Sequence, residues 1–121
     1  MDLIERVVTE LGVSEDRAVQ GVGGLFVAIR MAVDAKSFTK LTAAFPDAGR
    51  WMQHAPFKSG RTGEMLAIVT PGAVQRTMRI AGFTDEQIPH LGGIVGRAIQ
   101  DHLDGETYGR LAETLPILRA A

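Results

Sequence analysis

The sequence predicts an all-α fold, a compact helical bundle, and three observations lead to this prediction. Apolar residues recur at intervals of three and four along most of the chain, which is typical of amphipathic helices. Several stretches with this spacing begin after Ser or Thr and end at Gly or Pro. The chain also matches itself at a fixed offset. Only Met65–Val69 is equally compatible with a strand, and since no second strand candidate could pair with it, we expect a helix there.

The self-similarity has an offset of 70 residues. Residues 2–46 align with residues 72–116 without a gap, and nine further pairs keep their apolar, capping, acidic or basic character. The identical pairs are Arg6/Arg76, Gly12/Gly82, Gly23/Gly93, Ala28/Ala98, Ile29/Ile99, Asp34/Asp104, Leu41/Leu111 and Pro46/Pro116. We therefore expect one domain, residues 1–121, built from two three-helix repeats related by a pseudo-twofold axis. These repeats would span residues 2–46 and 71–116, joined by a helical connector at 47–70.

The first helix of each repeat is expected at Asp2–Leu11 and at Pro71–Ala81. The first of these carries Leu3, Ile4, Val7, Val8 and Leu11 at helical spacing. Gly12 and Gly82 follow the two segments, and glycine at this place commonly ends a helix.

The second helix of each repeat is the long one. Ser14 caps the long helix of the first repeat. This helix is apolar around most of its circumference, so we expect it to be buried at the centre of the bundle. Its counterpart, Asp85–Asp104, begins with the capping-box pattern Thr84-Asp-Glu-Gln87. Pro89 cannot donate a helical hydrogen bond, which predicts a kink or a separate turn there.

A short third helix ends each repeat. Its apolar residues are Phe38, Leu41, Ala44 and Phe45 in the first repeat and Tyr108, Leu111 and Leu115 in the second. Pro46 and Pro116 end these helices. In the connector, Asp47–His54 is expected to form a helical turn that carries Trp51 and Met52, and residues 55–63 a loop.

Composition excludes several classes of protein. With 45% hydrophobic and 22% charged residues the chain has the composition of a globular domain. It has no cysteine, which excludes disulfides and thiolate metal sites. It contains no apolar run of 18 residues that would span a membrane, and its acidic N-terminal segment is unlike a signal peptide. We therefore expect a cytoplasmic protein.

Several stretches carry a resemblance to a known family. These are LGVSEDRAVQGVGGLF, FTKLTAAFPDAGRWMQHAP and the long helix after AGFTDEQ. They resemble the VcgC/VcgE-type family of uncharacterised bacterial proteins, over most of the chain. The pattern of a long and a short helix that ends at Pro is also similar to another uncharacterised bacterial family of duplicated helical domains. The resemblance implies a duplicated helical fold, and it implies no activity, cofactor or catalytic residue.

No catalytic or metal-binding pattern is visible. His54, His90 and His102 lack the spacing of a helical metal site, and no GxSxG motif occurs. His102 falls on the apolar stripe of the second long helix, where a partly buried, hydrogen-bonded histidine is the ordinary expectation. A proton-transfer role would need a carboxylate or nucleophile brought near by the fold. We expect a protein that is not an enzyme and needs no cofactor or metal.

The charge is unevenly distributed. The whole chain has a formal charge of −1, but residues 48–84 hold five bases and one acid, +4, which leaves −5 elsewhere. Aromatic residues lie within this basic stretch. The sequence therefore predicts a face that binds another protein or a second copy, while the balanced total makes a nucleic-acid partner a weaker prediction. The face would comprise Arg50, Trp51, Phe57, Lys58 and Arg61, extended by Arg76 and Arg79. Trp51 could instead plug the bundle between the repeats.

The alternative function is a small-ligand carrier. Glycines inside the long helices lower helix stability, so they indicate a compensating gain. That gain is either close helix approach, with Gly23 and Gly93 at equivalent crossings, or a ligand cavity between the helices. Such a cavity would be lined by Gly23, Phe26, Gly93 and His102.

Overall fold

The computed structural model describes residues 2–55 and 71–119. Within these ranges it contains seven α-helices, one 3-10 helix and no strand, so the all-α prediction is confirmed. The elements are α1 (Leu3–Leu11), α2 (Glu15–Ala32), α3 (Ala35–Ala44), α4 (Ala48–Gln53), α6 (Pro71–Ile80), α7 (Gln87–Gln100), α8 (Gly105–Thr114) and η1 (Pro116–Arg119). The predictions for Met65–Val69 and for the loop beyond residue 55 lie outside the described residues.

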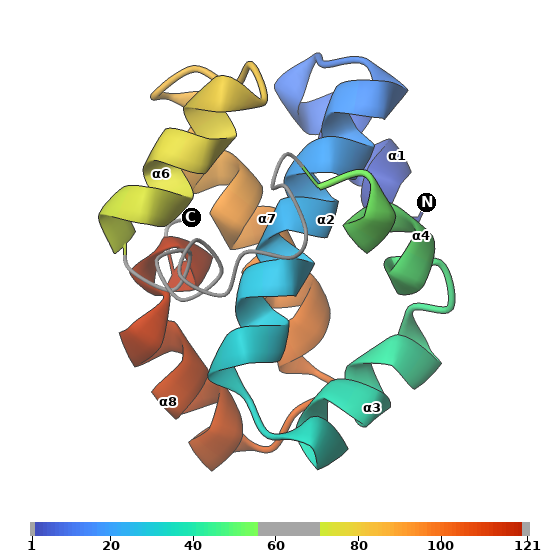
Figure 1. The fold of residues 1–121 in the computed structure, drawn as a ribbon, viewed down its shortest axis with the longest axis vertical. Coiled ribbons are helices and arrows are strands. Elements are labelled where there is room, and N and C mark those ends of the chain that lie inside the picture. The colour runs from blue at the N-terminus through green and yellow to red at the C-terminus, as the bar shows by residue number, and fades with distance from the viewer. Residues whose placement is uncertain (1, 56–70, 120–121) are drawn as a thin grey trace.

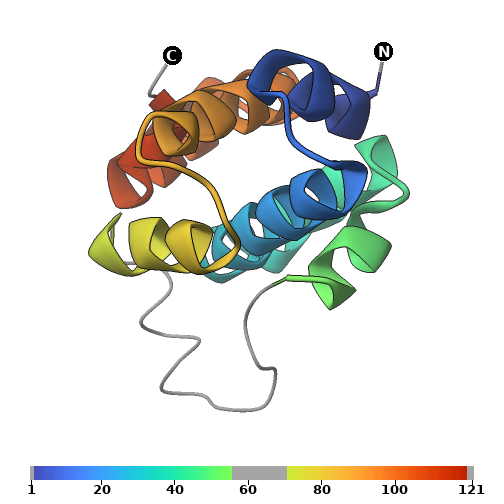
Figure 2. The ribbon, with the colours of Figure 1, turned by 90° about the horizontal axis from the view of Figure 1, so that it is seen from above.

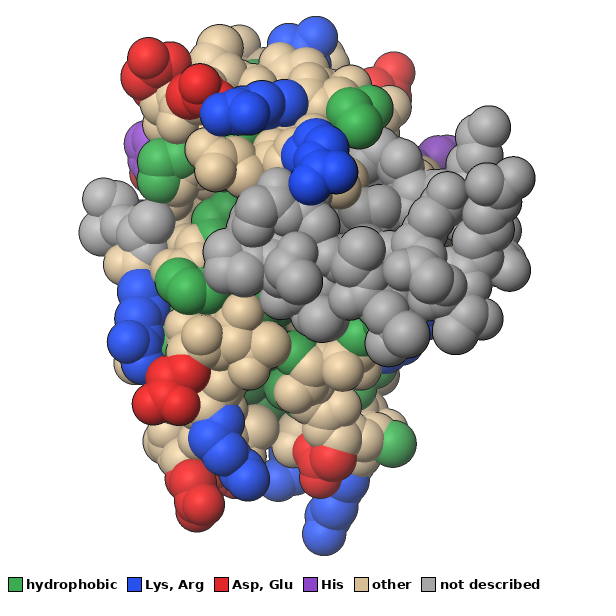
Figure 3. All heavy atoms as spheres, turned by 60° about the vertical axis from the view of Figure 1, so that its left-hand side comes forward, with side chains coloured by type: hydrophobic (Ala, Val, Ile, Leu, Met, Phe, Trp, Pro, Cys, Tyr) green, Lys and Arg blue, Asp and Glu red, His purple; other side chains and the backbone are tan. Residues whose placement is uncertain are grey.

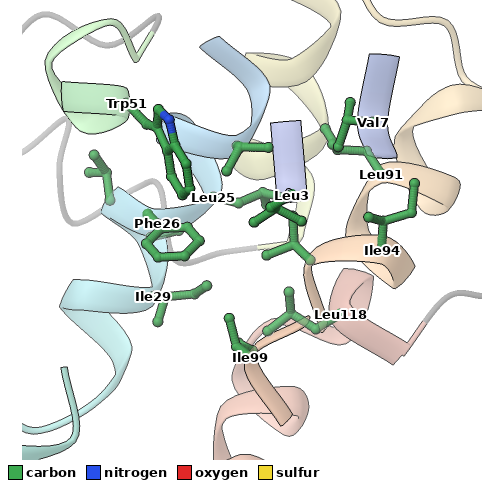
Figure 4. Packing of buried hydrophobic residues seen from close by; sticks show 14 of the residues in the cluster. Leu3, Val7, Leu25, Phe26, Ile29, Trp51, Leu91, Ile94, Ile99 and Leu118 are labelled. Atoms are coloured by element: carbon green, nitrogen blue, oxygen red, sulfur yellow. The ribbon is translucent and has the colours of Figure 1, made fainter. Parts of the chain in front are cut away.

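The two long helices, α2 and α7, cross at the centre of the molecule (Figure 1). Helices α1 and α6 lie at one end of the bundle and α3 and α8 at the other. Each of α1 and α6 contacts both long helices, so the two halves of the chain interlock (Figure 2). One cluster of buried hydrophobic side chains receives residues from every helix described, and part of it is shown in Figure 4.

Helix boundaries in the two halves agree with the 70-residue offset. Helices α3 and α8 begin and end at positions 70 residues apart. Asp34 and Asp104 cap them, each accepting a hydrogen bond from the backbone N–H three residues later. Gly12 and Gly82 both have positive φ, which glycine adopts without strain. Short helix α4 packs on α2 as η1 packs on α7. These correspondences support the predicted duplication and add a fourth short element to each half.

Helix α7 starts and ends inside its predicted range of 85–104. The predicted capping box is present: the Thr84 N–H donates to Gln87 Oε1 (3.0 Å) and the Gln87 N–H to Thr84 Oγ1 (3.1 Å). Pro89 has no N–H to donate to the carbonyl of Asp85, so residues 85–86 form a turn and the helix begins at Gln87. The helix continues through Pro89, which lies in the first turn, where its missing donor costs little.

The long helices do contain glycines for close approach, but the neighbour differs from the one predicted. A Cβ on Gly23 would collide with the backbone carbonyl of Trp51 on α4, rather than with α7. On α7, a Cβ on Gly92 or Gly96 would collide with backbone carbonyls of η1. Both collisions involve backbone atoms, which cannot move aside as a side chain can. The glycines therefore allow the short elements α4 and η1 to lie directly on α2 and α7.

Candidate interaction surface

The structure divides the predicted binding face into separate parts. Arg76 and Arg79 lie exposed on α6, and Arg50 lies exposed on α4. Helices α4 and α6 are on opposite sides of α2 (Figures 1 and 2), so these arginines do not form one patch. Phe57, Lys58 and Arg61 lie outside the described residues.

Trp51 belongs to the core, so the prediction that it is part of an exposed face is wrong. Its side chain is only 5% exposed. The indole packs edge-on against Phe26 (ring centroids 5.7 Å apart) and lies beside Phe45 (6.3 Å), as Figure 4 shows for the first pair. The cause is the fold-back of α4 onto α2 at Gly23, which turns the indole inward. Trp51 is therefore a core residue, and the two rings it contacts belong to the first half of the chain. Within the described part of the chain, the buried Trp51 Nε1 has no hydrogen-bond partner.

The ligand cavity predicted between the long helices is not formed by the residues named for it. Phe26 is fully buried and surrounded by core side chains, and α4 occupies the space above Gly23. Gly93 is buried on α7. His102 is exposed rather than partly buried, because α7 ends at Gln100 and leaves this residue in the following turn. Its ring stacks edge-on against Phe45 at 5.4 Å.

One exposed surface on α6 combines positive charge with an apolar side chain. We call it the α6 strip, and it consists of Gln75, Arg76, Arg79 and Ile80. Ile80 is 73% exposed and is the one large hydrophobic residue so exposed in the described part of the chain. Figure 3 shows this side of the molecule, where Lys and Arg side chains lie beside a hydrophobic side chain near the upper end. Sequence reasoning found Arg76 and Arg79 but missed Ile80.

The corresponding surface of the first half has a different charge. At an offset of 70, the α6 strip corresponds to exposed residues of α1, namely Glu5, Arg6, Thr9 and Glu10. Glu10 accepts from His90 Nε2 of α7 (3.2 Å) and lies 3.7 Å from Arg6. The α6 strip carries two positive charges and no carboxylate, while the α1 residues carry two carboxylates and one arginine. Ile80 could have been recognised from this alignment, because it occupies the position of an exposed glutamate.

A groove runs beside each of these helices. The α1 groove has a volume of about 410 Å³ and is lined by Asp2, Ile4, Glu5, Val8, Thr9, Glu15, Asp47, Arg50 and Trp51. The α6 groove has about 290 Å³ and is lined by Val74, Gln75, Asp85, Ile88, Pro89, Leu115, Pro116 and Ile117. Four lining positions correspond at the 70-residue offset: Ile4/Val74, Glu5/Gln75, Glu15/Asp85 and Asp47/Ile117. The first groove has an acidic rim, whereas the second is mainly apolar.

The acidic rim is negatively charged near neutral pH. The Glu5 N–H donates to Asp2 Oδ1 (2.8 Å), and this bond lowers the pKa of the Asp2 carboxyl. Asp47 stands at the N-cap of α4, yet its side chain makes no capping bond. The rim therefore presents four carboxylates against the single guanidinium of Arg50, a formal charge of −3.

Two further properties of the described residues limit the chemistry available. No group of three His, Asp or Glu side chains is placed to hold a metal ion within residues 2–55 and 71–119. No helix in these ranges is both long and apolar enough to cross a bilayer. The three histidines lie on different elements: His54 after α4, His90 on α7 and His102 after α7.

Comparisons of the chain with protein-family models, with curated proteins and with solved structures find no match. The resemblance to the VcgC/VcgE-type family therefore stays a prediction. The class that the described fold defines is an all-α bundle whose two long central helices are covered by shorter ones.

Proposed function

We propose that the protein is a non-catalytic protein-interaction module and that the α6 strip is its contact surface. The observation that carries this proposal is Ile80, exposed beside Arg76 and Arg79. A large aliphatic side chain in water forgoes the stabilisation that burial provides. Arginines next to an apolar anchor are typical of the residues that dominate binding energy at protein interfaces.

The rest of α6 supports a binding role for this strip. Val74 and Met78 on its other side are buried in the core, so α6 is held in place without Ile80. Arg79 contacts Asp85 (2.6 Å), but both side chains are about half exposed, and such a pair adds little stability. Arg76 makes no ion pair with the described residues. Two arginines suit an acidic protein surface better than a nucleic acid, whose binding needs many phosphate contacts.

Site-specific photo-crosslinking tests this proposal. A photoreactive phenylalanine would replace Ile80 in one protein and Glu113, an exposed residue of α8, in the control. Irradiation in the cells that produce the protein should give a discrete protein adduct from position 80 and none from position 113. If position 80 gives no protein adduct, or only the pattern seen from position 113, the proposal is wrong.

A small-ligand carrier is the second candidate, and one observation favours it. The α6 groove is lined mainly by aliphatic and proline side chains, as small-molecule sites commonly are. It is a different place from the cavity predicted between the long helices. A native mass spectrum of the purified protein tests this candidate. Extra mass that disappears on denaturation would support a carrier, and a protein free of bound mass at all stages of purification would contradict it.

A further inference from the structure

We infer that the partner of the α6 strip is a second copy of this chain, and that the strip docks in the α1 groove of that copy. This inference rests on the proposed function and names its partner. The contact joins two different surfaces of the same molecule, so copies would associate head to tail. Three features of the described residues support it: charge, the floor of the groove, and the way the two halves of the chain differ.

The charges of the two surfaces are complementary. The α6 strip carries Arg76 and Arg79, and the α1 groove has a formal charge of −3. In the described part of the chain Glu5, Glu15 and Asp47 form no ion pair through their carboxylates, and neither does Arg76. Arg79 is paired with Asp85 (2.6 Å), but both side chains are about half exposed. Opposed patches of this kind guide association and fix its register.

The groove also has an apolar floor for Ile80. Its lining includes Ile4 and Trp51, which are buried, and Val8, which is half-buried. A floor of hydrophobic side chains within a charged rim matches a strip in which one aliphatic side chain stands beside two arginines. Docking would bury the most exposed large hydrophobic residue described and would bring both arginines to the carboxylates.

The two halves of the chain differ at the positions that this contact needs. At the 70-residue offset, Thr9 corresponds to Arg79 and Glu10 to Ile80. In the grooves, Asp47 corresponds to Ile117. Each difference makes the first half more acidic and the second more basic or apolar. Two acidic grooves would repel each other, so these differences favour contacts between unlike halves over contacts between like halves.

The arrangement of the helices requires the contact to be intermolecular. Helix α6 lies on one side of α2, and α1 and α4 lie on the other (Figures 1 and 2). The strip of one molecule therefore cannot reach its own α1 groove. A head-to-tail contact leaves one strip and one groove free, and it closes into a ring or extends into a chain.

Sedimentation velocity with three variants tests the inference. The strip variant is Arg76→Gln/Ile80→Ser, and the groove variant is Glu5→Gln/Glu15→Gln. The control is Lys40→Gln, on α3 at the far end of the bundle. We expect the wild type and the control to associate with rising concentration, and less so with added salt. Either double variant should weaken association about thirtyfold or more, the scale of hot-spot residues. Circular dichroism checks that each variant is folded.

Mixing the two double variants gives the sharpest result. The groove variant keeps an intact strip and the strip variant keeps an intact groove, so the mixture should form a one-to-one dimer that grows no further. A mixture that stays monomeric, or a groove variant that associates like wild type, would overturn the inference. A wild type that stays monomeric while position 80 crosslinks to a different protein would overturn only the second-copy partner. Absence of any adduct from position 80 would overturn the proposed function as well.

Discussion

Single glycines determine how closely the helices of this molecule approach. Gly23 allows the backbone of α4 to lie on α2, and Gly92 and Gly96 allow η1 to lie on α7. Gly109, in the middle of α8, has no atom within 4 Å of where its Cβ would be. Glycine is therefore required for packing at positions 23, 92 and 96, and it serves no packing purpose at position 109.

Gly23→Ala should destabilise the protein strongly, and Gly109→Ala should stabilise it. The added methyl group at position 23 meets a backbone carbonyl, so α4 must shift, at a cost of about 1–3 kcal/mol or more. At position 109 the methyl group meets open space and removes the helix penalty of glycine, a gain of about 0.5–1 kcal/mol. Urea unfolding followed by the fluorescence of Trp51, the single tryptophan, measures both. Equal effects of the two substitutions would contradict this account of Gly23.

For single residues, the sequence predicted helix capping better than it predicted burial. Ser14 and the Thr84–Gln87 pair cap helices as predicted, because capping depends on neighbours three residues away. The environments of Trp51 and His102 depend on where α4 folds back and where α7 ends. No pattern of three or four residues determines where those elements fold back or end. The sequence therefore left two alternatives for Trp51, an exposed face or a place inside the bundle.

Among the elements, α3 and α8 are the most closely matched pair. Both contain ten residues, and both begin after an aspartate that accepts a backbone hydrogen bond. The bonds to Ser37 lower the pKa of Asp34, and the bond from the Thr107 N–H lowers the pKa of Asp104. Because folding favours the ionised form of each cap, the stability of these helices depends on pH.

Acid should destabilise the wild type more steeply than Asp34→Asn/Asp104→Asn. A lowered pKa contributes stability that is fully present above the ordinary value of about 3.9 and is lost as the pH falls through the lowered value. Asparagine can still cap a helix but does not titrate. Unfolding free energies from urea titrations between about pH 5 and pH 3 give the two slopes. Equal slopes for the wild type and the double variant would refute the prediction.

For the whole molecule, the two halves form one core. Helices α1 and α6 each pack on both α2 and α7, and the buried cluster takes residues from every described helix. The fold class and the places of most helices followed from periodicity and capping residues. The binding surface could be predicted only in part from the sequence, since helical spacing does not show that α4 and α6 lie on opposite sides of α2. The 70-residue alignment indicates that Ile80 is exposed, because it pairs Ile80 with the exposed Glu10.

Separated halves should fold only together. Eleven of the 18 residues of α2 are buried, many by elements of the other half, so residues 1–55 alone would expose much of that surface to water. The same holds for α7 in residues 56–121. We expect each fragment to have little helix and no cooperative unfolding, and an equimolar mixture to regain both. Far-UV circular dichroism and gel filtration of the fragments and their mixture measure this. A fragment that unfolds cooperatively by itself would show that its half is an independent domain, and the interlocked arrangement would then contribute little to folding.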